Sequence, residues 1–197
     1  MASTYRTIYC DPPWPEYGGG KSKRGADRHY PLMSVSKIKA LPIDKLADSA
    51  GCHLWLWATG NYLAAAVECV QAWGFRLINF RPWVKANDQF VQLRPGSQDI
   101  PVHVQIPQNP GLGQYMRCDA EILLFAVMGK SPRTGYKPRQ TIYSPRGRHS
   151  AKPACVREDI ERMSPAPRLE LFARSRHDDW DAWGNEVESD DVMGDYR

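Results

Sequence analysis

Apolar residues gather in short runs along the chain, separated by segments rich in proline, glycine and charge. Residues 52–58 form a compact apolar run bounded by turn residues, which is typical of a strand buried on both faces. Residues 4–10 alternate and are rich in β-branched and aromatic side chains, and Pro12 and Pro13 stop the sheet pairing after them. We predict strands at both segments, and further strands at residues 75–85, 121–128 and 168–173.

A helical period appears between residues 62 and 73, where apolar side chains recur every three or four positions. Gly74 is placed to end this helix, because glycine readily adopts the left-handed conformation of a helix C-terminus. Ser34 is suited to cap a short helix, which Pro42 must end.

Another amphipathic helix is predicted to begin at Pro153, with Ser150 as its expected cap. Its apolar positions follow the helical period and are Val156, Ile160 and Met163. Strands that alternate with helices indicate an α/β fold, in which helices cover both faces of the sheet. In such sheets ligands bind outside the carboxyl ends of the strands.

The length of 197 residues is about that of one domain. We predict a single domain over residues 1–188, followed by an acidic and mobile tail at 189–197. Two segments, residues 16–30 and 87–116, have the glycine, proline and charge content of loops, and we expect them to recognise the substrate.

Hydrophobic residues make up 42% of the chain and charged residues 24%, which excludes a largely disordered chain and a collagen-like repeat. The longest apolar runs, such as residues 122–128, are far shorter than the roughly twenty residues of a membrane helix. No secretory signal opens the sequence, so we expect a cytoplasmic protein without membrane contact. Widely spaced cysteines and the absence of a helical histidine pair predict reduced thiols and no metal.

Charge is unevenly distributed. Residues 122–157 carry eight lysines and arginines and no acidic residue, whereas residues 178–197 carry eight acidic residues and one arginine. The asymmetry fits a face that binds a polyanion such as nucleic acid, beside a solvated acidic segment. A solvated basic loop explains the basic segment equally well on its own.

The tetrapeptide Asp-Pro-Pro-Trp at residues 11–14 follows the first predicted strand, so we expect it at the ligand-binding edge of the sheet. Asp11 supplies a carboxylate, and Pro12 a carbonyl with no competing N–H nearby; both can accept hydrogens from an amine. Trp14 offers a flat face on which a base can stack. These features suit the exocyclic amine of a nucleobase, whose nitrogen they would activate toward an electrophile. The alternative is a proline-stiffened strand end with a core tryptophan.

Further motifs follow in a set order: His-Tyr-Pro at 29–31 with Met-Ser at 33–34, Leu-Trp-Leu-Trp-Ala-Thr-Gly at 54–60, Trp-Val-Lys at 83–85, and segments 149–153, 161–165, 169–174 and 183–186. Together with Asp-Pro-Pro-Trp they resemble the S-adenosylmethionine-dependent adenine-N6 methyltransferases. The resemblance is to the Asp-Pro-Pro-Trp branch, which includes the eukaryotic mRNA adenosine methyltransferase and its bacterial and phage relatives. It implies a Rossmann-like, three-layer fold in the permuted order, with the catalytic motif ahead of the donor-binding strand.

The resemblance also implies residue roles. The catalytic loop would consist of Asp11, Pro12, Pro13 and Trp14. The donor S-adenosyl-L-methionine would be bound by Cys10, Asp11, Lys152, Arg174, Arg176, Asn185 and Glu186. Lys152 would take its methionine carboxylate, Arg174 its ribose, and Asn185 with Glu186 its adenine. The nucleic acid would contact Trp14, Tyr17, Tyr30, Lys85, Arg146 and Arg148.

The chain departs from the family pattern at Ala173, Arg176 and Glu186, where relatives often have Gly, His and Gln.

From the Asp-Pro-Pro-Trp motif and the family resemblance we expect direct in-line methyl transfer to adenine N6 in DNA, on a base that is extruded or single-stranded. An RNA adenosine methyltransferase, a cytosine-N4 methyltransferase and a catalytically silent nucleic-acid-binding subunit are the alternatives. The protein is expected to be a monomer or a homodimer.

Overall fold

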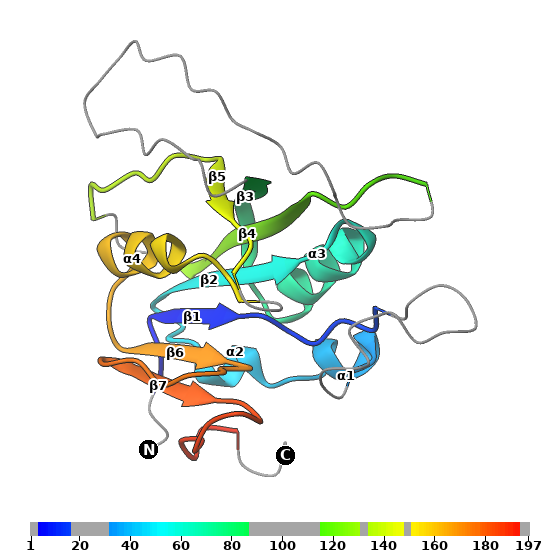
Figure 1. Cartoon of the computed structure of the whole chain (residues 1–197). Helices are drawn as coiled ribbons and strands as arrows, with labels where there is room; N and C mark the ends of the chain where they lie inside the picture. The colour runs from blue at the N-terminus through cyan, green and yellow to red at the C-terminus, as the bar shows by residue number, and fades with distance from the viewer. Residues whose placement is uncertain (1–3, 17–31, 87–114, 131–133, 148–150, 194–197) are drawn as a thin grey trace.

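The computed structural model describes residues 4–16, 32–86, 115–130, 134–147 and 151–193. A seven-stranded sheet runs through them in the order β5-β3-β4-β2-β1-β6-β7 (Figure 1). All neighbouring strands are parallel except β4, which runs antiparallel to both β2 and β3. The strands are β1 (Thr7–Cys10), β2 (Gly51–Ala58), β3 (Arg76–Ala86), β4 (Ala120–Gly129), β5 (Ile142–Pro145), β6 (Arg168–Leu171) and β7 (Trp180–Trp183).

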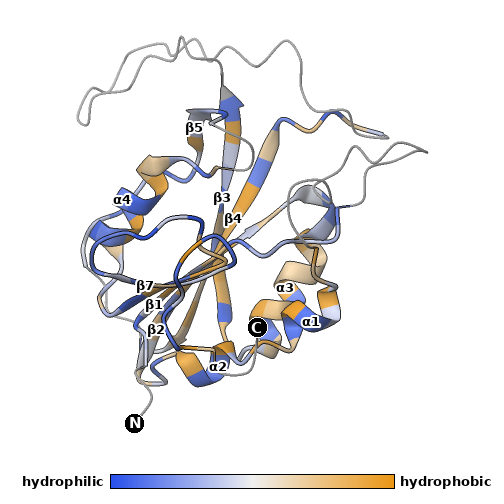
Figure 2. Cartoon of the chain, turned by 60° about the horizontal axis from the view of Figure 1, so that its bottom comes forward, coloured by the Kyte–Doolittle hydropathy of each residue, from blue (hydrophilic) through white to orange (hydrophobic). Residues whose placement is uncertain are grey.

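Helices cover both faces of this sheet, as the alternating pattern predicted. Figure 2 shows α4 on one side and α1, α2 and α3 on the other, which confirms the α/β, three-layer arrangement. None of the helices in the described ranges is long and apolar enough to cross a membrane. The helices are α1 (Val35–Lys39), α2 (Ile43–Leu46), α3 (Leu63–Ala72) and α4 (Ala154–Met163), with a 3₁₀ turn, η2 (Gly60–Tyr62).

The central strand β2 contributes to both apolar cores. Leu54 and Leu56 pack into the cluster that includes residues of α1, α2 and α3, while Trp55 and Trp57 pack into the cluster that includes residues of α4. All four side chains are at most 1% exposed. Since successive strand residues point to opposite faces, burial on both sides accounts for the continuous apolar run at this position.

Two of the predicted helix ends are confirmed. The Ser34 side chain accepts the backbone N–H of Lys37 and caps α1. Gly74 has a φ of +77° and ends α3, which is the conformation that favours glycine. The cap expected at Ser150 lies outside the described residues, and Pro153 at the start of α4 makes no side-chain capping bond.

Short elements have no counterpart in the sequence prediction. These are β5, β7, α2 and η2, each three or four residues long. Elements of this length are too short to display a period of their own. β7 also lies among acidic residues, whose composition is typical of a solvated segment. Its buried residues, Trp180, Ala182 and Trp183, are too few to show a strand pattern against that background.

The C-terminal segment at residues 189–193, which the sequence analysis assigned to a tail after residue 188, contacts β7 and the apolar core. Asp190 donates its backbone N–H to the Ala182 carbonyl of β7 at 2.8 Å. Met193 is 4% exposed and packs in the apolar cluster on the side of α1 and α3. Acidic composition suggested a solvated tail, but Met193 binds the segment to the core; residues 194–197 lie outside the described ranges.

Candidate active site

A cleft lies at the carboxyl ends of the central parallel strands. β1 and β6 are parallel neighbours, so Asp11, directly after β1, and Arg174, shortly after β6, come to the same end of the sheet. The cleft is lined by Asp11, Pro13, Phe172, Ala173, Arg174, Asn185 and Glu186. The structure thus brings together Asp11, Arg174, Asn185 and Glu186, which the family resemblance had implied for donor binding.

Asp11 is the first of four side chains of alternating charge that are joined by ion pairs: Asp11, Lys152, Glu121 and Lys85. The Nζ of Lys152, just before α4, lies 3.0 Å from Asp11 Oδ2 and 3.0 Å from Glu121 Oε2. Glu121 also accepts from Lys85 Nζ at 2.6 Å. The four side chains are between 13% and 23% exposed, so these ion pairs are largely shielded from water.

Sequence reasoning missed Glu121. It lies next to Lys152 because β4 runs antiparallel, which brings the first residues of β4 to the same end of the sheet as the last residues of β2. No local pattern around residue 121 marks it as a site residue. Only strand pairing reveals its position.

Burial and these ion pairs determine the charge states. Burial raises the pKa of Asp11 above its ordinary value, and the Lys152 ammonium offsets only part of that effect. Burial opposes the charge of Lys152, but Asp11 and Glu121 together raise its pKa. Burial also opposes ionisation of Glu121, yet Lys152 and Lys85 bring the pKa of that carboxyl below its usual range. Lys152 and Glu121 therefore stay charged, while Asp11 is the member that protonates most readily.

Replacing Glu121 by glutamine is expected to lower the free energy of unfolding by about 3 kcal/mol, because Lys85 and Lys152 both lose a buried counter-charge. Urea unfolding at neutral pH measures the loss. Glu68→Gln is the control, since it breaks the exposed Lys39 pair and is expected to change stability by less than about 1 kcal/mol. Equal changes in the two variants would show that the buried charge chain does not contribute as described.

Trp14 does not offer the open stacking face that the sequence suggested. Its side chain is 4% exposed, its ring stacks on Tyr62 with centroids 5.6 Å apart, and Nε1 donates to the Trp57 carbonyl at 2.9 Å. The alternative reading, a core tryptophan at a proline-stiffened strand end, describes this environment better. The indole anchors the loop to β2 and η2, and a substrate base cannot stack on it in this conformation.

The loop after β1 is fixed by several further bonds. Pro12 does have a nearby donor, contrary to expectation: the Trp14 N–H donates to its carbonyl at 2.8 Å. A carbonyl oxygen has two lone pairs, so Pro12 keeps one acceptor position. The Tyr62 hydroxyl donates to the Pro15 carbonyl at 2.6 Å, and Glu16 accepts from the Thr59 hydroxyl. The loop is therefore held rigidly against the end of β2.

Two predicted donor-binding residues have other surroundings. The Cys10 side chain is fully buried in the apolar core, so its thiol does not face the cleft. Burial also raises the pKa of this thiol, which keeps it neutral. Arg176 donates to the Glu188 carbonyl and to the Asp190 carboxylate, and it does not line the cleft.

The predicted substrate-binding residues are only partly described. Lys85 lies in the charge chain, and Arg146 is exposed and donates to the Cys118 carbonyl at 2.9 Å. Tyr17, Tyr30 and Arg148 lie outside the described residues, as do most of the loops at 16–30 and 87–116. In the ranges that the structure does describe, no group of three or more His, Cys, Asp or Glu side chains is placed to hold a metal ion.

The mixed sheet and the cleft at its carboxyl edge define an α/β protein of the Rossmann-like methyltransferase class. The family model of MT-A70 matches residues 5–186. The chain therefore belongs to the MT-A70 family, which confirms the resemblance that the ordered motifs predicted.

Several relatives are methyltransferases by name. The chain is 30% identical over 205 residues to the Type II methyltransferase M.MunI of Mycoplasma sp., covering 93% of this chain and 78% of that protein. It is 25% identical to the human N(6)-adenosine-methyltransferase catalytic subunit METTL3, covering 93% of this chain and 28% of METTL3. Human METTL4, an N(6)-adenine-specific methyltransferase, is 29% identical, with 93% and 38% covered. The chain thus spans less than half the length of either human relative.

Proposed function

We propose that this protein transfers a methyl group from S-adenosyl-L-methionine to N6 of adenine in DNA. The observation that carries the proposal is the position of Asp11. Its carboxylate lines the same cleft as Arg174, Asn185 and Glu186, at the edge of the sheet where such folds bind ligands. Membership of the MT-A70 family and the relatives with named adenine-N6 activity support this reaction class.

The residues around the cleft fit S-adenosyl-L-methionine by their chemistry. The amino-acid end of the donor carries a carboxylate, and Lys152, whose Nζ lies 3.0 Å from the cleft residue Asp11, is the cation proposed to attract it. The adenosine end needs hydrogen-bonding groups, which Arg174, Asn185 and Glu186 supply. When bound, the donor supplies an electrophilic methyl group on a positively charged sulfur.

The side chains and carbonyls of this protein would then prepare the acceptor amine. The Asp11 carboxylate accepts one hydrogen of the amine, and the remaining lone pair of the Pro12 carbonyl accepts the other. Both bonds strengthen as positive charge develops on the nitrogen, so they stabilise the transition state more than the ground state. Lys152 and the bonded loop after β1 hold the two acceptors in place, which avoids reorganisation during the reaction.

DNA is the polymer we favour. M.MunI, a Type II methyltransferase, is matched over most of its length, whereas METTL3 is matched over about a quarter of its own. Phosphate binding needs accessible cations, and exposed candidates lie at Lys130, Lys137, Arg139 and Arg146. Lys152 and Arg157 of the same basic segment are instead engaged in shielded ion pairs, with Asp11 and with Glu170.

The test is methyl transfer from labelled S-adenosyl-L-methionine to single-stranded DNA, duplex DNA and RNA, followed by nucleoside mass spectrometry. We expect N6-methyladenine in DNA. Label in RNA alone would favour the adenosine methyltransferase, and N4-methylcytosine would change the target base. Donor and DNA binding without any transfer would indicate the catalytically silent subunit and would contradict the proposal.

A further inference from the structure

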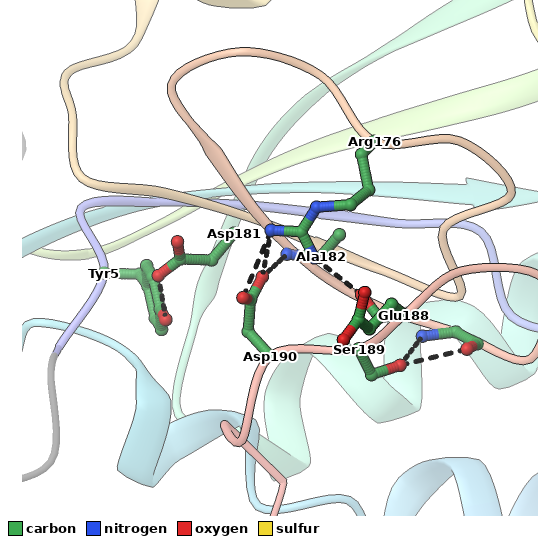
Figure 3. Close-up of polar contacts among 8 residues, drawn as sticks. Tyr5, Arg176, Asp181, Ala182, Glu188, Ser189 and Asp190 are labelled. Atoms are coloured by element: carbon green, nitrogen blue, oxygen red, sulfur yellow. Dashed lines mark hydrogen bonds and ion pairs between the residues drawn. The ribbon is translucent and has the colours of Figure 1, made fainter.

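A compact set of polar contacts joins the two segments that flank β7 (Figure 3). Arg176, before β7, donates from Nη1 to the Glu188 carbonyl at 2.6 Å and from Nη2 to the two Asp190 carboxylate oxygens at 3.1 and 3.0 Å. Asp190 Oδ2 also accepts the backbone N–H of Ala182 in β7 at 2.8 Å. The Asp190 carboxylate is thus bound to β7 and to the segment that precedes it. We call Arg176 and Asp190 the clamp.

The cleft residues after β7 lie inside the loop that the clamp closes. Asn185 and Glu186, which line the cleft, follow Gly184 directly. Ser189 Oγ accepts the Gly184 N–H and donates to the Gly184 carbonyl, both at 3.0 Å. A Cβ on Gly184 would lie 2.2 Å from the Ala173 carbonyl oxygen, so the turn packs directly against the backbone of the opposite cleft wall.

The clamp also restrains that opposite wall. Arg174, two residues before the clamp arginine, lines the cleft and lies 3.7 Å from the Glu186 carboxylate. The Asp190 carboxylate therefore connects the segment with Arg174 on one side of the cleft to the turn with Asn185 and Glu186 on the other. Asp190 itself is not among the residues that line the cleft, so it can act on a ligand there only through the segments that it binds.

We propose that Asp190 is a positioning residue for the methyl donor. Through Arg176 and the Ala182 N–H, it holds the turn with Asn185 and Glu186 against the wall with Arg174. This inference rests on the assignment of the cleft as the donor site. A preorganised turn loses less conformational entropy when a ligand binds, so the clamp raises donor affinity without touching the donor.

The clamp is poorly suited to a purely stabilising role. The Arg176 and Asp190 side chains are 47% and 33% exposed, and exposed ion pairs contribute little to global stability. Met193 independently binds the C-terminal segment to the apolar core. Breaking the clamp is therefore expected to loosen the turn locally and to leave the fold intact.

The experiment compares Asp190→Asn, Asp190→Ala and Arg176→Lys with the wild-type protein. Asparagine keeps an acceptor for the Ala182 N–H but loses the charge, and lysine keeps the charge but loses the bidentate geometry. Asp191→Asn is the matched control, because Asp191 is the exposed neighbour of Asp190. Calorimetry gives the donor Kd, steady-state kinetics give kcat and the KM values for donor and DNA, and thermal unfolding gives Tm.

We expect Asp190→Ala to raise the donor Kd and the donor KM roughly tenfold, since it removes charge-assisted hydrogen bonds. Asp190→Asn and Arg176→Lys should show smaller increases, while the KM for DNA stays within about twofold and Tm within about 4 °C of wild type. Asp191→Asn should match the wild type in every measurement.

Two results would overturn the positioning role alone: unchanged donor Kd in all clamp variants, or an affinity loss that appears only together with a large fall in Tm. Both results concern only the variants. If the wild-type protein binds and uses the donor in the same experiments, the proposed function is unaffected. Failure of the wild-type protein to bind S-adenosyl-L-methionine would overturn the proposed function and this inference together.

Discussion

Asp11→Ala is expected to lower kcat for methyl transfer roughly 10³-fold, the size of effect seen when a group aimed at developing charge is removed. The variant should remain folded, because Lys152 keeps its ion pair with Glu121 and no buried charge is left alone. Donor binding should fall much less than turnover, since the other cleft residues remain. Labelled-methyl turnover and calorimetric donor binding measure the two quantities separately.

Asp44→Ala, which removes an exposed carboxylate in α2, is the control and should retain wild-type turnover. Equal losses of donor binding and turnover in Asp11→Ala would assign Asp11 to the donor alone. The pH dependence gives a second check. Because burial raises the pKa of Asp11, lowering the pH should protonate this carboxylate, and so reduce kcat, at a higher pH than for a free aspartate.

Trp14→Ala is expected to lower the free energy of unfolding by about 3–5 kcal/mol, the range for truncating a buried aromatic side chain. The variant loses the stack on Tyr62, the bond to the Trp57 carbonyl and the packing of a side chain that is 4% exposed. Turnover should fall as well, because the loop that carries Asp11 loses its anchor. Urea unfolding gives the stability change, and kinetics at saturating donor give the activity.

Trp14→Phe separates packing from hydrogen bonding. It keeps an aromatic ring against Tyr62 but leaves the Trp57 carbonyl without its donor, so we expect a smaller loss of about 1–3 kcal/mol. If Trp14→Ala kept wild-type stability and weakened only DNA binding, Trp14 would be an accessible stacking surface and its burial would not describe the working enzyme.

Much of the fold was predictable because local physics and tertiary packing agree. The apolar run that became β2 is buried on both faces, and the glycine that ends α3 has the positive φ that its position suggested. Asp11 could be placed at the edge of the sheet where ligands bind, because it directly follows a strand pattern at residues 4–10 and precedes two prolines that stop the strand. The short strand β7 escaped prediction because four residues carry too little periodic signal.

The candidate site was predictable only in part. Motif order identified Asp11, Arg174, Asn185 and Glu186, and the cleft contains all of them. Residue type did not reveal environment: an Asp-Pro-Pro-Trp tryptophan looks the same whether it is exposed or, as here, buried against Tyr62. An arginine beside the donor motif likewise looked like a ligand contact, although Arg176 binds the protein's own C-terminal segment.

The amino-acid sequence by itself determined the α/β class, the family and the position of the Asp-Pro-Pro-Trp loop after β1, because these depend on local periodicity and on ordered motifs. Tertiary structure alone decided which distant groups meet. It placed Glu121 beside Lys152 through an antiparallel strand, buried Trp14, and paired Asp190 of the acidic segment with Arg176. The physical reason is that charge pairing and burial depend on distance in space, which sequence separation does not specify.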